Sequence, residues 1–211
     1  MARPPALFEQ IVGDTEAFRL MLDGALKDCA SPYLVWLPDA GFLSGREYHA
    51  ALGAFFGLLF GHPHGERLYR AQAEAIAYHL DESRAGSLVF TCEVTGLRTV
   101  AVPVRVADTL AAVVFCCITR PTDPDEQRQF KAAVGQLEKT LGLAAGQLVQ
   151  YTARLPDEAD PGLDKTVERV QRVVAALAQL GEDRLALQRA QQQEHWRMQA
   201  IRALQVANQQ L

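Results

Sequence analysis

The chain has 211 residues, of which 49% are apolar and 22% are charged, and its formal net charge at pH 7 is −4. This size fits one globular domain with an extension, and the acidic balance with scattered arginines excludes the basic patch by which proteins bind nucleic acid. The longest apolar run, residues 50–60, is too short for a bilayer-spanning helix. We therefore expect a cytoplasmic protein whose partners include neither nucleic acid nor membrane.

The first third of the chain predicts three helices around one short strand. Residues 14–30 begin with a capping pair and carry an apolar stripe, and residues 33–37 (YLVWL) form a dense apolar strand followed by turn residues. A capping box opens the aromatic-rich segment 44–60, which predicts a heavily buried helix. After a break rich in glycine and proline, residues 66–80 predict a further helix.

Residues 87–119 are the stretch around which the rest of the chain is organised. Valine alternates with other residues over 98–106, which predicts a half-buried strand, and residues 107–109 reverse the chain. The return run 110–118 is apolar on both faces, which predicts a strand covered on both sides. Because side chains alternate along a strand, Cys116 and Cys117 should point to opposite faces.

The C-terminal part predicts helices only. Apolar residues recur at helical spacing over 130–141, a shorter helix follows over 144–154, and the acidic segment 157–162 has the composition of a boundary. Residues 163–211 predict one long helix, or two joined near Gly181. The apolar residues of this segment fit two heptad seams in different phases, which are typical of a coiled coil. The first seam has Leu163, Val167, Val170, Val174 and Leu177; the second has Leu187, Ala190, Ile201, Leu204 and Leu211, and also contains the polar Arg197.

The chain resembles the PocR-type sensory domain, a relative of the GAF and PAS ligand-binding folds. The matching segments lie within residues 56–180 and read FGLLFGHPHGERLYRAQAEA, TCEVTGLRTVAVPVRV, LAAVVFCCI and the helical tail LGLAAGQLVQYTARLPDEADPGLDKTVERVQRVVAALAQL. The family often carries cysteines at positions that correspond to Gly57 and Tyr69 here, and only Cys92 is retained. The usual histidine after this cysteine is Glu93, which argues against cysteine-based metal or redox chemistry.

The resemblance implies a non-enzymatic sensor. We expect an α+β fold with a GAF/PAS-like antiparallel sheet flanked by helices over residues 1–156. Residues 157–211 then form a signalling helix of coiled-coil type that leads to an output module such as a kinase, a cyclase or a transcription regulator. The protein should form a homodimer through its N- or C-terminal helices and bind a small apolar or weakly polar metabolite. The sequence identifies no cofactor.

Aromatic and soft polar residues near the predicted hairpin and the helix 66–80 are the candidates for a ligand pocket, since such pockets are mostly apolar with a few polar anchors. Tyr33 and Trp36 should face opposite sides of their strand, so that only one looks into a cavity. The predicted ligand-binding residues are Trp36, Phe56, Tyr69, His79, Cys92, Arg98 and Cys116.

Motifs for catalysis are missing: the sequence has no GxSxG elbow, no Walker sequence and no GxGxxG loop. Three histidines (His62, His64, His79) and Cys92 are residue types that zinc accepts, but no CxxC or HExxH spacing is present, and we predict no metal site. Two alternatives stay open. The chain could be a ligand-free GAF-like dimerisation scaffold, or a haem- or metal-binding gas or redox sensor that uses His79, His62 or Cys92.

Overall fold

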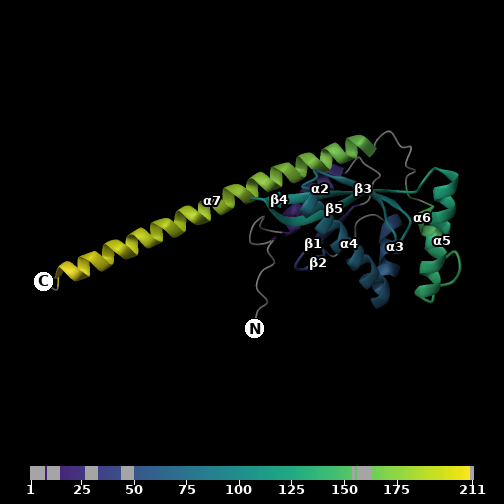
Figure 1. The fold of residues 1–211 in the computed structure, drawn as a ribbon, viewed down its shortest axis with the longest axis horizontal. Coiled ribbons are helices and arrows are strands. Elements are labelled where there is room, and N and C mark those ends of the chain that lie inside the picture. The colour runs from purple at the N-terminus through teal and green to yellow at the C-terminus, as the bar shows by residue number, and fades with distance from the viewer. Residues whose placement is uncertain are drawn as a thin grey trace.

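A computed structural model of the chain describes residues 8, 15–26, 33–43, 50–153, 155 and 163–209. These residues form an α+β fold in which helices cover both faces of one antiparallel sheet and a long helix projects from the domain (Figure 1). The α+β class and the antiparallel sheet predicted from the sequence are confirmed. The described helices include none that is both long and apolar enough to cross a membrane.

The sheet has five described strands in the order β2-β1-β5-β4-β3, and all neighbours are antiparallel. β4 and β5 pair along most of their length and form the centre of the sheet, as the sequence predicts. Two short strands, β3 beside β4 and β2 at the opposite edge beside β1, are not identified by the sequence analysis. The strands are β1 (Leu34–Leu37), β2 (Gly41–Phe42), β3 (Leu88–Thr91), β4 (Arg98–Val106) and β5 (Thr109–Thr119).

Two hydrophobic clusters divide the core, one on each face of the sheet. The face rich in aromatic residues is covered by α3, α4, α5 and α6, and the other face by α2 and the first part of α7. Nearly every residue of β4 is buried, so the prediction of a half-buried strand is wrong; helices cover it on both sides. The helices are α2 (Thr15–Leu26), α3 (Ala50–Gly61), α4 (Pro63–Ser83), α5 (Pro124–Thr140), α6 (Val149–Thr152) and α7 (Leu163–Gln209).

The β4–β5 hairpin closes with a two-residue turn. Val106 pairs with Thr109, and the residues between them, Ala107 and Asp108, both have positive φ (47° and 66°). Positive φ at both central positions is the type I′ geometry, whose twist matches that of the two strands. The turn is therefore one residue shorter than the sequence predicts.

A β-bulge near the end of β5 changes the direction of Cys117. Val100 and Arg98 of β4 pair with Cys116 and Thr119, so β5 has one extra residue here, and Cys117 takes a φ of 52°. Cys116 and Cys117 consequently lie in the same buried cluster, and the prediction that they point to opposite faces is wrong. The Cys117 side chain hydrogen-bonds the Cys116 thiol and, together with burial, raises the pKa of Cys116 well above its ordinary value.

Helix α7 is continuous through Gly181 and has two parts that differ in burial. In the first part Val170, Val174 and Leu177 pack against the valines of β4 and the apolar residues of β5. Val167, Val170, Val174 and Leu177 of the first predicted heptad seam thus pack inside the chain, against its own sheet and α2. After Gly181 the described side chains are exposed apart from the half-buried Leu185, and this part projects from the domain (Figure 1).

Candidate functional site

An open cleft of about 470 Å³ lies beside the turn of the β4–β5 hairpin. Its walls come from three elements that are distant in the sequence: the end of β1, the C-terminal half of α4, and the turn with the first residues of β5. This is the space between the hairpin and the helix in which the sequence predicts a pocket. The lining residues are Trp36, Pro38, Glu74, Ala77, Tyr78, Asp81, Asp108, Thr109 and Leu110.

Trp36 forms the buried part of the cleft wall. Its side chain is only 1% exposed, and its ring packs edge to face against Phe42 with the ring centroids 4.9 Å apart. The guanidinium of Arg70 lies over the indole, with Cζ 5.6 Å from the ring centroid, and is also paired with Glu66 at 3.0 Å. The indole Nε1 is buried and donates to no acceptor within the described part of the chain. As predicted, Tyr33 and Trp36 lie on opposite faces of the sheet.

Polar contacts fix the hairpin to α4 along one edge of the cleft. Arg105 Nη1 donates to Asp81 Oδ1 over 2.7 Å, and Arg105 Nη2 donates to the carbonyl of Leu80. Arg84, which caps the C-terminal end of α4 with a φ of 54°, donates from Nη1 to the Asp108 carbonyl over 2.9 Å. The hydrogen bond from Arg105 holds the pKa of Asp81 below its ordinary value. These hydrogen bonds therefore connect α4 directly to the hairpin turn, and both elements line the cleft.

Three carboxylates line the cleft, and the residues that line it include no basic side chain. Asp81 is paired with Arg105 and, at 3.9 Å, with Arg84. Within the described residues, neither Glu74 nor Asp108 has a side-chain hydrogen bond or ion pair. The Tyr78 hydroxyl, which also lines the cleft, donates to Glu82 over 2.5 Å, and this hydrogen bond raises the pKa of Tyr78.

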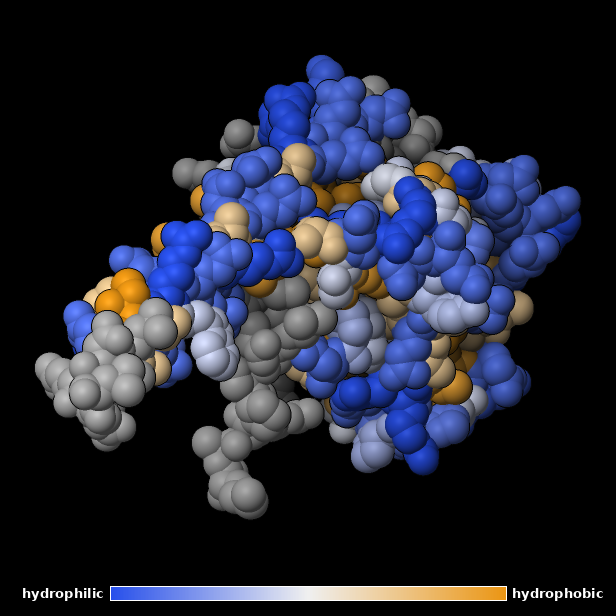
Figure 2. Space-filling view, turned by 60° about the vertical axis from the view of Figure 1, so that its left-hand side comes forward, coloured by the Kyte–Doolittle hydropathy of each residue, from blue (hydrophilic) through white to orange (hydrophobic). Residues whose placement is uncertain are grey.

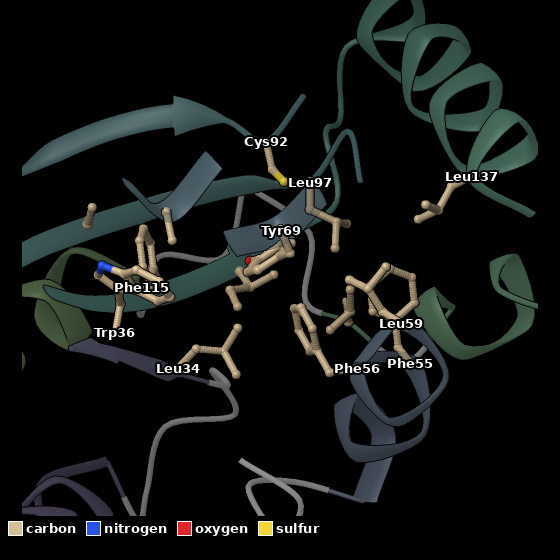
Figure 3. Close-up of a cluster of buried hydrophobic side chains, with 14 of the residues drawn as sticks. Leu34, Trp36, Phe55, Phe56, Leu59, Tyr69, Cys92, Leu97, Phe115 and Leu137 are labelled. Atoms are coloured by element: carbon tan, nitrogen blue, oxygen red, sulfur yellow. The ribbon is translucent and has the colours of Figure 1, made fainter. Parts of the chain in front are cut away.

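Of the seven residues predicted from the sequence to bind a ligand, Trp36 lines this cleft. Phe56, Tyr69 and Cys92 belong to the same buried cluster as Trp36 but do not line the cleft (Figure 3). The rings of Phe56 and Tyr69 are 5.3 Å apart in an edge-to-face contact. Burial raises the pKa of Tyr69 well above its ordinary value, and burial likewise raises the pKa of Cys92, whose thiol donates to Gln72 Oε1 over 3.4 Å. These three residues act as core.

The other three predicted residues lie elsewhere. His79 is exposed on α4, Arg98 begins β4 at the end away from the turn and pairs with Glu126 at 3.9 Å, and Cys116 is buried on the opposite face of the sheet. Of the histidines considered for metal, His62 caps α4 by accepting a hydrogen bond from the His64 backbone N–H. Over the described ranges, no group of three or more histidine, cysteine, aspartate and glutamate side chains is placed to hold a metal ion.

Sequence reasoning misses most of the cleft, including Glu74, Asp81 and Asp108. These residues are separated by 7 and 27 positions and form no motif, so no periodicity connects them. The only local signal is that Asp108 lies in the reversal between two strong strand patterns, where functional loops are frequent.

Comparison of the chain with protein-family models, with curated protein sequences and with solved structures finds no match in any of the three.

Proposed function

We propose that this chain is the small-molecule-sensing domain of a signal transduction protein, with GAF/PAS-like architecture, and that it reports ligand occupancy through α7. It performs no catalysis itself in this account. The observation that carries the proposal is that the β4–β5 hairpin contributes both to the cleft and to the surface that contacts α7. Its turn lines the cleft, and the strands behind the turn form the surface on which α7 packs.

The hairpin offers a short physical route between these two places. A ligand that contacts Asp108, Thr109 or Leu110 acts on the turn, and Arg105 and Arg84 link this turn to the end of α4. A few residues further along the same strands, Val104 and Ala112 lie in the cluster that α7 covers. If the hairpin has two positions that pack differently on α7, a ligand that binds one position more tightly shifts the equilibrium toward it. The size of that shift is set by the difference between the two binding free energies.

The projecting part of α7 supports a homodimer. Residues 182–209 extend about 42 Å at the rise of an α-helix, and an isolated helix in water gains too little from its own hydrogen bonds to be stable without packing. Apolar side chains are exposed along it, namely Leu187 (59%), Trp196 (70%), Met198 (47%) and Ile201 (48%). Figure 2 shows such apolar groups among hydrophilic ones at this projecting end. Leu180, Leu187 and Ile201 are separated by multiples of seven residues and therefore lie on one side of the helix. This spacing fits pairing with the same helix of a second copy.

Thermal-shift screening against a library of cellular metabolites tests the proposal. A ligand of the native state raises the melting temperature as its concentration exceeds its dissociation constant. Trp36→Phe, which removes the indole N–H of a residue that lines the cleft, should weaken that shift, whereas Trp196→Phe on the projecting helix should leave it unchanged. A screen in which no compound stabilises the protein, or in which both variants respond like the wild type, would contradict the proposal.

A ligand-free dimerisation scaffold is the second candidate function. It is favoured by the tightly packed aromatic cluster, in which Phe56, Phe60 and Tyr69 fill the interior next to Phe42. A scaffold would dimerise through α7 without stabilisation by any metabolite. The same screen, repeated at concentrations above and below the dimer dissociation constant, separates the two functions.

A further inference from the structure

We propose that the ligand of the cleft is a small organic cation that also carries a hydrogen-bond acceptor, such as an ammonium group on a short chain that ends in a carbonyl. This inference rests on the proposed function in one respect: it takes the cleft beside Trp36 as the ligand site. The sequence alone favours an apolar or weakly polar metabolite, whereas the carboxylates that line the cleft favour a charged one.

The first observation is the indole N–H of Trp36. A buried donor without an acceptor costs about 1–3 kcal/mol, so buried donors are nearly always paired in folded proteins and an orphan needs an explanation. Trp36 is 1% exposed, and its Nε1 is unpartnered within the described residues. In Figure 3 this nitrogen points away from the labelled aromatic side chains Phe115 and Tyr69. A hydrogen-bond acceptor on a bound molecule would give the indole N–H of Trp36 the partner that it lacks.

The second observation is the charge around the opening. Glu74 on α4 and Asp108 on the turn face the cleft from two different walls, and neither is paired within the part of the chain that the structure describes. The nearby cations are already engaged: Arg105 and Arg84 with Asp81, and Arg70 with Glu66 and the Trp36 ring. The cleft therefore presents two exposed carboxylates that form no ion pair of their own among the described residues, although Arg84 donates to the Asp108 carbonyl, and their negative charge favours a cation over an anion.

The third observation limits the ligand's size and nature. A volume of about 470 Å³ is within the range of small-molecule pockets. Ala77, Leu110 and Pro38 give the walls an apolar part that suits an aliphatic chain. A bare metal ion does not fit, because the indole N–H is a donor and the described carboxylates form no ligand cluster. A molecule with a cationic end and an accepting end satisfies both kinds of group.

Nuclear magnetic resonance of the ¹⁵N-labelled chain tests the inference, because the protein has only two tryptophans, Trp36 and Trp196. Each gives one indole N–H signal, the first reporting the cleft and the second the projecting helix. The probes are three amides of equal chain length, titrated into the millimolar range: 4-aminobutanamide, which is cationic, butanamide, which is neutral, and succinamate, which is anionic. We expect a saturable shift of the Trp36 signal with 4-aminobutanamide, and at least a tenfold weaker response to the other two.

The matched variant is Glu74→Gln with Asp108→Asn, which keeps the shapes of both side chains and removes their charges. It should reduce the response to 4-aminobutanamide to the level of butanamide. An equal or stronger response to butanamide or succinamate, an unchanged response in the variant, or no Trp36 shift with any probe would overturn the inference.

The same experiment separates this inference from the proposed function. If the cation shifts the Trp36 signal but no signal from residues 163–181 or Trp196, the ligand class stands and the signalling role fails. If a neutral or anionic metabolite from the thermal-shift screen shifts Trp36 and the residues of α7 instead, the signalling role stands and the ligand class fails.

Discussion

Arg105 of β4 and Asp81 of α4 are joined by a hydrogen bond of 2.7 Å that crosses from the hairpin to the helix at the edge of the cleft. The Arg105 side chain is 19% exposed and that of Asp81 is 51% exposed, so the pair is partly screened by solvent. Arg105 also donates to the Leu80 carbonyl, which is at the end of the same helix. Two contacts from one guanidinium thus fix the relative position of the two main walls of the candidate site.

Asp81→Asn should lower the free energy of unfolding at neutral pH, and the difference from the wild type should vanish in acid. Arg105 lowers the pKa of the folded-state Asp81 carboxyl below its unfolded value, so the contribution is present above the unfolded pKa, near pH 4, and disappears as the pH falls through the folded pKa. Urea unfolding of variant and wild type at a series of pH values checks this. Glu168→Gln, at an exposed ion pair with Arg172, is the control and should change little. A difference between Asp81→Asn and wild type that is independent of pH would be inconsistent with the pairing.

Gly96→Ala should be strongly destabilising. Gly96 has a φ of 68°, and a Cβ at this position would lie 2.8 Å from the Cα of Phe130 in α5. The backbone conformation costs about 1–2 kcal/mol for a residue with a side chain, and the clash adds about 1–3 kcal/mol. Gly142→Ala is the matched control, because φ is 65° there and no atom lies within 4 Å of the added Cβ. Denaturant midpoints should fall much further for Gly96→Ala, and equal losses in the two variants would disprove the close approach to α5.

Ala107→Asn should stabilise the hairpin by about 0.5–1 kcal/mol, since asparagine tolerates positive φ far better than alanine and is preferred in type I′ turns. Ala107 has a φ of 47° at the first central position of the turn. The same substitution at Ala71, on the exposed side of α4, should instead cost about 0.5 kcal/mol of helix propensity. Thermal unfolding of both variants is the measurement, and a lower melting temperature for Ala107→Asn would contradict the turn geometry.

Leu187→Glu combined with Ile201→Glu should convert the proposed dimer to a monomer. Both side chains are exposed in the chain by itself, and burying four like charges in a paired helix seam is unfavourable. The domain should keep its melting temperature as a monomer, because the described side chains beyond Leu185, including Leu187 and Ile201, are exposed. Sedimentation velocity measures the change, with Gln188→Glu outside the seam as control. If the double variant sediments like the wild type, α7 is not the dimer contact.

The two central strands can be predicted because the alternation of apolar residues along them is long and involves only neighbouring positions in the sequence. Val100, Val102 and Val104 alternate with other residues, and they do share one buried face. The short strands β2 and β3 were missed since two to four residues carry little periodicity. Cys117 was placed on the wrong face because one extra residue in β5 reverses the alternation, and a bulge of this kind depends on the pairing with β4.

The candidate site was less predictable than the fold for a physical reason. Aromatic bulk in Phe56 and Tyr69 indicates burial, and burial alone does not distinguish a packed core from a pocket wall. The orphan N–H of Trp36 and the unpaired carboxylates of Glu74 and Asp108 acquire meaning only when three separate segments meet. In α7 the heptad spacing of Val167, Val170 and Val174 predicts a helix pair, yet a helix that packs on a sheet needs the same apolar stripe.

Hydrogen–deuterium exchange on α7 tests the central claim most directly. The protein is measured with and without the most stabilising metabolite of the thermal-shift screen, and Trp36→Phe serves as the variant whose response should be weaker. We predict that ligand changes the exchange rates of the cleft segments 74–84 and 106–111 and also those of residues 163–181, which lie on the far face of the sheet. Changes confined to the cleft segments, with identical exchange along α7, would contradict the claim that this helix reports the state of the cleft.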